Sequence, residues 1–84
     1  MSLDKQVIFN VIKANTVKVM PDIRPEDVSI DGSLSDLGAN SIDRVEIAIY
    51  SLQDLGLKIP TSEMHGLKNL QGLVDLFHRY AAAQ

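Results

Sequence analysis

The spacing of apolar residues is the feature that most limits how this chain can fold. In three segments, residues 3–19, 41–55 and 69–80, apolar side chains recur at intervals of three and four positions. Such intervals place these side chains on one face of an α-helix, so each segment predicts an amphipathic helix. Pro21 and Gly56 stand shortly after the first two segments, where residues that end helices are expected. We therefore expect an all-α bundle with three longer helices.

Each predicted helix has an apolar stripe that we expect to face the core. In the first helix, for which Ser2 is a candidate cap, the stripe consists of Leu3, Val7, Ile8, Val11, Ile12 and Val19. In the second helix the residues predicted to face the core are Ile42, Val45, Ile49 and Leu52. In the third helix, which Asn69 is predicted to cap, they are Leu70, Leu73, Val74, Phe77 and Tyr80.

A long connection, punctuated by proline and glycine, separates the first two helices. At about 20 residues it is unusual for a compact domain. Its spaced apolar residues are expected to anchor it across the helices, and they are Ile23, Val28, Ile30, Leu34 and Leu37. We expect one turn at residues 25–27 and another at 35–36. One short helix at 61–65, between a proline and a glycine, completes the predicted bundle.

Length and composition exclude several kinds of protein. With 84 residues, the chain forms one domain, residues 1–84, that buries a modest core. Cysteine is absent and the formal net charge is −3, which argues against a disulfide framework, a thiol nucleophile and a nucleic-acid binder. No apolar run approaches the roughly 18 residues of a membrane helix, and no secretory signal is recognisable. We expect a monomeric, cytoplasmic protein.

A serine near the middle of the chain stands where the second helix is predicted to begin. Gly38 allows the backbone to turn, Asn40 and Ser41 are both favourable N-cap residues, and Asp43 places a carboxylate in the first turn. The free N–H groups and the dipole at a helix N-terminus favour a phosphate on this hydroxyl. We interpret Ser41 as the attachment point of a phosphate-linked group; a simple helix cap is the alternative.

The residues around this serine resemble the modification motif of acyl carrier proteins. Residues 36–43 read Asp-Leu-Gly-Ala-Asn-Ser-Ile-Asp, with Val-Glu-Ile at 45–47, and the usual form in the family is Leu-Gly-x-Asp-Ser-Leu/Ile. Leu-Gly-Leu-Lys-Ile-Pro at 55–60 resembles the loop after the family's second helix, and Asn-Leu-Gln-Gly-Leu-Val-Asp-Leu at 69–76 resembles its last helix. The resemblance covers nearly the whole chain and implies an acyl-carrier-like four-helix bundle with a long first loop.

This resemblance implies that Ser41 carries 4′-phosphopantetheine, transferred from coenzyme A by a phosphopantetheinyl transferase. The terminal thiol of that arm would hold acyl groups as thioesters and present them to successive enzymes. The chain itself would be a carrier and not an enzyme. Asn40 departs from the Asp that most members have before the serine, and so removes a negative charge that is thought to assist the transferase and its metal.

The resemblance also implies a docking surface for partner enzymes. In the family this surface is the part of the second helix just after the modified serine, and the short third helix borders the acyl chain. The corresponding residues are Asn40, Ile42, Asp43, Arg44, Glu46, Ile47 and Met64. Arg44 departs from a purely acidic face and would narrow the choice of partners. For Ile47 and Tyr50 the alternative is packing at the edge of the core, and for Met64 it is ordinary core packing.

The resemblance also implies a biosynthetic pathway. The stretches at residues 40–46 and 69–75 depart from the common fatty-acid carrier pattern. They look more like free-standing carriers of bacterial polyketide clusters, in particular the acetyl donor of a β-branching cassette. The implied partners are an acyltransferase, a ketosynthase or an HMG-CoA synthase-like enzyme. A fatty-acid carrier is the nearest alternative, whereas the Gly-Gly-x-Ser-Leu motif of peptidyl carriers is absent. A carrier-fold interaction module without a prosthetic group is the alternative from another functional class.

Catalysis by the chain itself is not predicted. A serine nucleophile needs a positioned base, and the sequence around Ser41 lacks both the second glycine of a G-x-S-x-G elbow and a preceding strand. The two histidines, His65 and His78, are interpreted as surface residues. No spacing typical of metal ligands is present, so no metal site is predicted.

Overall fold

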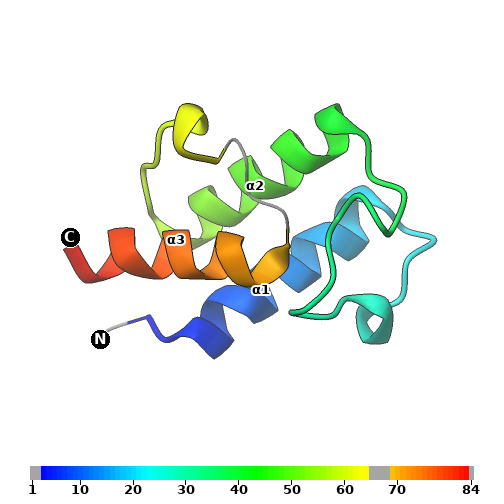
Figure 1. Cartoon of the computed structure of the whole chain (residues 1–84), viewed down its shortest axis with the longest axis horizontal. Coiled ribbons are helices and arrows are strands. Elements are labelled where there is room, and N and C mark those ends of the chain that lie inside the picture. Colours follow the sequence, from blue (N-terminus) through cyan, green and yellow to red (C-terminus); the bar gives the residue numbers. More distant parts are fainter. Residues whose placement is uncertain (1–2, 65–68, 84) are drawn as a thin grey trace.

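The structure, a computed structural model, describes residues 3–64 and 69–83, and within them every regular element is helical. The helices are α1 (Lys5–Val19), α2 (Ser41–Leu55) and α3 (Leu70–Ala83), with the short 3₁₀ turns η1 (Pro25–Asp27) and η2 (Thr61–Met64). Helix α1 packs against both α2 and α3 (Figure 1). The predicted all-α bundle, with three longer helices, one short helix after α2 and a long first loop, is confirmed.

Helix α1 begins later than its apolar stripe indicated. The carboxylate of Asp4 accepts a hydrogen bond from the Val7 backbone N–H over 2.8 Å, which makes Asp4 the N-cap. The proposed cap Ser2 lies outside the described residues. Ile8 and Ile12 are fully buried, whereas Val7 is 42 % exposed, so its predicted place in the core is wrong. Successive helical residues are about 100° apart, and the face that continues through Asn15 turns Val7 outward.

Helix α2 shows the largest departure from the sequence-based expectation. Leu52 is buried as predicted, but three residues of the predicted inner stripe are exposed: Ile42 by 67 %, Val45 by 48 % and Ile49 by 39 %. The face that lies in the core is instead formed by Ile47, Ala48, Ser51 and Leu52. Both rows have intervals of three and four residues, so periodicity alone does not distinguish them. Packing against α1 decides between them.

The long first loop is anchored as predicted. Val28 and Leu34 are buried, while Ile23, Ile30 and Leu37 pack against the core. The turns expected near residues 25–27 and 35–36 are both present. The backbone of the loop also contacts α3, because the carbonyl of Gly32 accepts from the Leu70 N–H over 2.9 Å and that of Ile30 from the Gln71 N–H over 3.0 Å. These two bonds satisfy N–H groups that a helix start otherwise leaves free.

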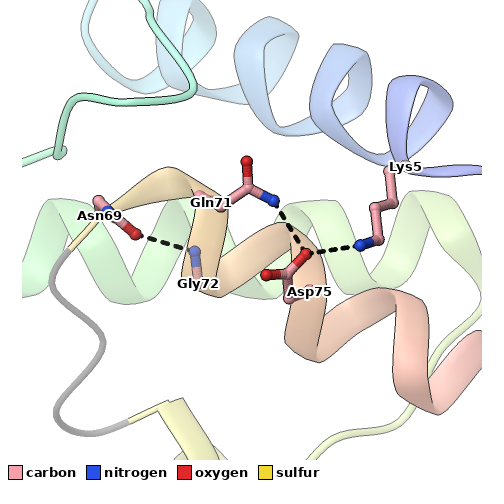
Figure 2. Close-up of polar contacts among 5 residues, drawn as sticks. All are labelled: Lys5, Asn69, Gln71, Gly72 and Asp75. Atoms are coloured by element: carbon pink, nitrogen blue, oxygen red, sulfur yellow. Dashed lines mark hydrogen bonds and ion pairs between the residues drawn. The ribbon is translucent and has the colours of Figure 1, made fainter.

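Helix α3 is capped by Asn69, whose Oδ1 accepts from the Gly72 N–H over 2.9 Å (Figure 2). Its buried residues are Leu70, Leu73, Val74, Leu76 and Phe77, and Tyr80 is half-buried. The helix continues past the predicted end at Tyr80 to Ala83. Lys5 Nζ lies 3.0 Å from Asp75 Oδ1, which joins α1 to α3 (Figure 2).

None of the helices within residues 3–64 and 69–83 has the length and apolar run that a membrane crossing requires.

Candidate functional site

The start of α2 is fixed by a reciprocal pair of hydrogen bonds. Asn40 Oδ1 accepts from the Asp43 N–H over 2.8 Å, and Asp43 Oδ2 accepts from the Asn40 N–H over 3.3 Å. This is a capping box in which Asn40 has the extended backbone expected of an N-cap. Ser41 is therefore the first helical residue. The alternative interpretation, that Ser41 is simply the helix cap, does not hold, because Asn40 is the cap.

The turn before the helix depends on Gly38. Its φ of +96° lies in the left-handed region that side-chain-bearing residues rarely adopt, and an added Cβ would meet nothing within 4 Å. Glycine is thus required for the backbone conformation and not for space, in keeping with the expectation that Gly38 allows the backbone to turn. The buried Ala39 follows, and it holds the chain against the core just before the cap.

The hydroxyl of Ser41 is exposed and uncommitted. Ser41 Oγ makes no hydrogen bond with any residue that the structure describes, and no described group accepts from the N–H groups of Ser41 and Ile42. The positive end of the α2 dipole lies here. An anionic group on Ser41 Oγ would therefore meet free donors and a favourable dipole, so this position fits a phosphate ester.

A shallow, largely apolar depression of about 260 Å³ adjoins this hydroxyl. Ser41, Ile42, Val45 and Glu46 line it. Together with Ile49, the two apolar residues form an exposed row along the outer face of α2, which we call the outer row: Ile42, Val45 and Ile49. This places an apolar surface beside an acidic side chain next to the candidate attachment point.

Arg44 connects α2 to the preceding turn. Its Nη1 donates a hydrogen bond to Ser35 Oγ, and both side chains are exposed. Residues 34–38 form this turn, in which the Leu37 N–H donates to the Leu34 carbonyl over 3.1 Å. The guanidinium is therefore bonded to the loop, while the side chain remains exposed to solvent.

The structure brings most of the predicted site residues together. Asn40, Asp43, Arg44 and Glu46 share the first turns of α2 with Ser41 and Ile42, but two predicted docking residues lie elsewhere. The predicted docking role of Ile47 is wrong, because its side chain is fully buried among the core residues. Met64 lies in η2 and packs partly against the core, in keeping with its structural alternative. Sequence reasoning missed Val45 and Ile49 as surface residues, although their spacing from Ile42 was recognised.

Other chemistry is sparse in the described residues. His65 lies outside them, and His78 is half-buried on α3, where a mostly exposed position was expected. Within residues 3–64 and 69–83, no three His, Cys, Asp or Glu side chains come close enough together to hold a metal ion.

Comparison with known proteins identifies the family. Residues 14–77 match the family model described as "Phosphopantetheine attachment site". This chain is a member of the acyl carrier protein family. It is 40 % identical over 76 residues to the polyketide biosynthesis acyl-carrier-protein AcpK of Bacillus subtilis (strain 168), a match that covers 90 % of this chain and 93 % of that protein. It is also 34 % identical over 82 residues to an acyl carrier protein of Thermosynechococcus vestitus, with 96 % and 100 % coverage.

A solved structure supports the same assignment at the level of the fold. The crystal structure of the HMG synthase of the curacin biosynthetic pathway in complex with an acetyl donor-ACP contains a matching chain, with a TM-score of 0.84 and 34 % identity. The match covers 92 % of this acyl carrier and 99 % of that chain. The family predicted from the sequence is confirmed, and so is its cofactor, 4′-phosphopantetheine.

Proposed function

We propose that this acyl carrier bears 4′-phosphopantetheine on Ser41 Oγ and delivers acyl groups in bacterial polyketide biosynthesis. The observation that carries the site is the exposed hydroxyl of Ser41 at the first position of α2, with capping performed by Asn40. This hydroxyl is accessible to a modifying enzyme, and its neighbours leave room for an anion. When attached, the arm supplies a terminal thiol that holds an acyl group as a thioester.

Attachment requires a partner enzyme, because no residue that the structure describes is bonded to the Ser41 hydroxyl to activate it. Ser41 Oγ would attack the coenzyme A phosphorus nearest the pantetheine, forming the O–P bond while the pyrophosphate P–O bond breaks. The serine proton passes to a base of the phosphopantetheinyl transferase, and adenosine 3′,5′-bisphosphate leaves. In the described part of the chain no base is hydrogen-bonded to Ser41 Oγ, so we assign the base for this step to the transferase.

The docking surface is proposed to be the outer row with its charged neighbours. The row offers exposed apolar side chains, while Asp43 and Glu46 lie beside it and carry negative charge. A fitting partner therefore presents an apolar patch bordered by basic residues. Among the predicted partners, an acyltransferase, a ketosynthase and an HMG-CoA synthase-like enzyme, the last is favoured because the similar donor carrier was solved with an HMG synthase. We propose an acetyl-donor role on this ground.

The attachment site is tested by modification and intact mass. The protein is incubated with coenzyme A and a broad-specificity phosphopantetheinyl transferase, beside Ser41→Ala and the control Ser62→Ala, which removes another exposed hydroxyl. A gain of one phosphopantetheine unit in wild type and Ser62→Ala, and none in Ser41→Ala, supports the proposal. Modification of Ser41→Ala would overturn the site. Failure of folded wild-type protein, with the transferase active on another carrier, favours the interaction module.

The pathway is tested separately with the modified carrier. Acetyl-loaded protein is offered to an HMG-CoA synthase-like enzyme of a β-branching pathway, and malonyl loading by a fatty-acid malonyltransferase is measured in parallel. Faster acetyl delivery than malonyl loading supports the donor role. The reverse order favours a fatty-acid carrier. This second candidate is supported by the full-length similarity to the Thermosynechococcus acyl carrier protein.

A further inference from the structure

Arg44 is the cationic side chain nearest in sequence to the proposed attachment point. It lies three positions after Ser41 on α2, a spacing that places the two side chains on neighbouring positions of one helix face. Within residues 36–54 it is the only lysine or arginine, whereas Asp43 and Glu46 on either side of it are acidic. An anion on Ser41 would therefore have in Arg44 a neighbour on the same helix able to neutralise it.

The direction of the Arg44 side chain also favours this contact. Side chains on a helix tilt toward its N-terminus, so a long residue at this position covers the turn that begins with Ser41. The observed bond to Ser35 Oγ shows that the guanidinium reaches the turn that precedes α2 in the chain. Its exposure leaves it free to change partner.

The two candidate partners of Arg44 differ in strength. The Ser35 hydroxyl is a neutral acceptor, whereas a phosphodiester on Ser41 Oγ would carry a full negative charge. Charge-assisted bonds from guanidinium to phosphate oxygens are stronger than bonds to neutral acceptors, and they form with two parallel N–H donors. Among the described residues Arg44 forms no ion pair with Asp43 or Glu46, and its guanidinium is bonded to Ser35 Oγ instead.

We propose that Arg44 is a positioning residue for the prosthetic arm, a role that rests on attachment at Ser41. When Ser41 is modified, the guanidinium leaves Ser35 Oγ and pairs with the phosphodiester. The base of the arm is thereby held over the first turn of α2. At the same time the turn at residues 34–38 loses its side-chain bond to α2. Attachment of the arm at Ser41 thereby loosens this part of the loop.

The change is confined to one part of the loop. Ile30 and Gly32 remain bonded to the start of α3 through their carbonyls, and nothing in the exchange of partners affects those bonds. The amides of Leu37 and Gly38 should therefore respond to modification, while those of Leu70 and Gln71 should not. These two pairs form a reporter and an internal control within one molecule.

The experiment uses nitrogen-15-labelled protein before and after complete modification, with intact mass confirming the arm. We expect a shift of the Arg44 Nε–H resonance on modification, and roughly two- to five-fold faster hydrogen exchange at Leu37 and Gly38 with no change at Leu70 and Gln71. Raising the salt concentration should reduce the Arg44 shift, because exposed ion pairs are screened. The phosphorus resonance of the arm provides an independent readout.

Matched variants separate positioning from structure. Arg44→Gln should abolish the change in the phosphorus resonance, Arg44→Lys should retain part of it, and Lys58→Gln, which removes an exposed charge after α2, should leave it unaltered. Ser35→Ala in the unmodified protein should reproduce the faster exchange at Gly38. Mass gain at Ser41 without a shift of the Arg44 resonance overturns this inference and leaves the proposed function intact. Modification at another residue overturns both.

Discussion

The side-chain amide of Asn15 on α1 donates a hydrogen bond to the hydroxyl of Ser51 on α2 over 3.2 Å, and both side chains are buried. The same amide lies 3.0 Å from Asp54 Oδ2 and 3.1 Å from the Val11 carbonyl oxygen. Ser51 Oγ in turn donates to the Ile47 carbonyl over 2.7 Å. Because buried polar groups need partners, this contact selects the face of α2 that meets α1 and leaves the outer row in solvent.

Replacing Asn15 tests this contact. We expect Asn15→Ala to lower the free energy of unfolding by about 1–3 kcal/mol, because Ser51 loses a buried partner. Asn10→Ala on the same helix removes only an exposed bond with Gln6, and it should change stability by less than about 0.5 kcal/mol. Urea unfolding followed by circular dichroism measures both. Equal effects of the two substitutions would contradict a specific role for the buried contact.

The two apolar rows of α2 should respond differently to truncation. Ile47→Ala removes a fully buried side chain and should cost about 2–5 kcal/mol. Ile42→Ala removes one that is 67 % exposed and should change stability by only about 0.5 kcal/mol. The same urea experiment decides between them, since the opposite order would mean that the row predicted from periodicity faces the core.

Two substitutions of the helix cap Asn40 distinguish its effect on stability from the effect of charge at this position. Asn40→Ala removes the acceptor of the Asp43 N–H and should cost about 0.5–2 kcal/mol, whereas Asn40→Asp keeps an acceptor and should preserve stability. Thermal unfolding measures the two variants. The rate of phosphopantetheine transfer to Asn40→Asp then reports the charge alone: faster transfer than to wild type would assign the residue at this position a role in the transferase reaction.

Gly56 should be the less replaceable of two glycines. It ends α2 with a φ of +68°, so Gly56→Ala forces a side-chain-bearing residue into the left-handed region, at about 1–2 kcal/mol. Gly32 has no positive φ, and a Cβ there meets the Ser29 carbonyl oxygen at an ordinary 3.5 Å. Gly32→Ala should therefore be much milder in thermal unfolding. Comparable losses would show that backbone conformation is not the main constraint at Gly56.

The ion pair between α1 and α3 should give a pH-dependent contribution to stability. Hydrogen bonds from Lys5 and Gln71 lower the pKa of Asp75 below its ordinary value of 3.8. A carboxyl whose pKa is lower in the folded state stabilises that state above its unfolded pKa, and the contribution is lost as the pH falls through the folded pKa. The stability difference between wild type and Asp75→Asn should thus persist near neutral pH and shrink below about pH 4.

Urea midpoints measured from about pH 7 to about pH 3 test this expectation. Asp22→Asn is the control, since this exposed carboxylate has no ion pair with any residue that the structure describes. A difference between wild type and Asp75→Asn that is independent of pH would rule out the charged pair as its source.

Local sequence signals predicted much of the fold. Asn40 and Asn69 cap helices through their own side chains, and Gly56 ends one through its own backbone freedom. Each of these effects involves residues within one turn, so the residue type is enough to predict it. The apolar residues spaced along the long loop also predicted that the loop is anchored on the helices. A loop lying free in solvent would have left these apolar side chains exposed to water.

The candidate site was predicted in part for the same reason. The local backbone of the site depends on Gly38 and on the bonds between Asn40 and Asp43, which are only three positions apart in the sequence. The motif around Ser41 is likewise a continuous stretch of sequence. Its outer surface was predicted only in part: Val45 and Ile49 were assigned to the core and Ile47 to the surface, because both rows of α2 have helical spacing. The partners of distant residues were also beyond reach, as in the bond from Arg44 to Ser35.

The sequence by itself determined the three main helices and both ends of α2, which residue is displayed at the start of α2, and the family to which the chain belongs. Tertiary structure decided which face of α2 is buried and which loop atoms meet α3. Asn15 and Ser51 lie far apart in the sequence, and their bond forms only when α1 and α2 pack. Capping depends on neighbours along the chain, whereas burial depends on neighbours in space, and periodicity gives no information about the latter when two faces of a helix are apolar.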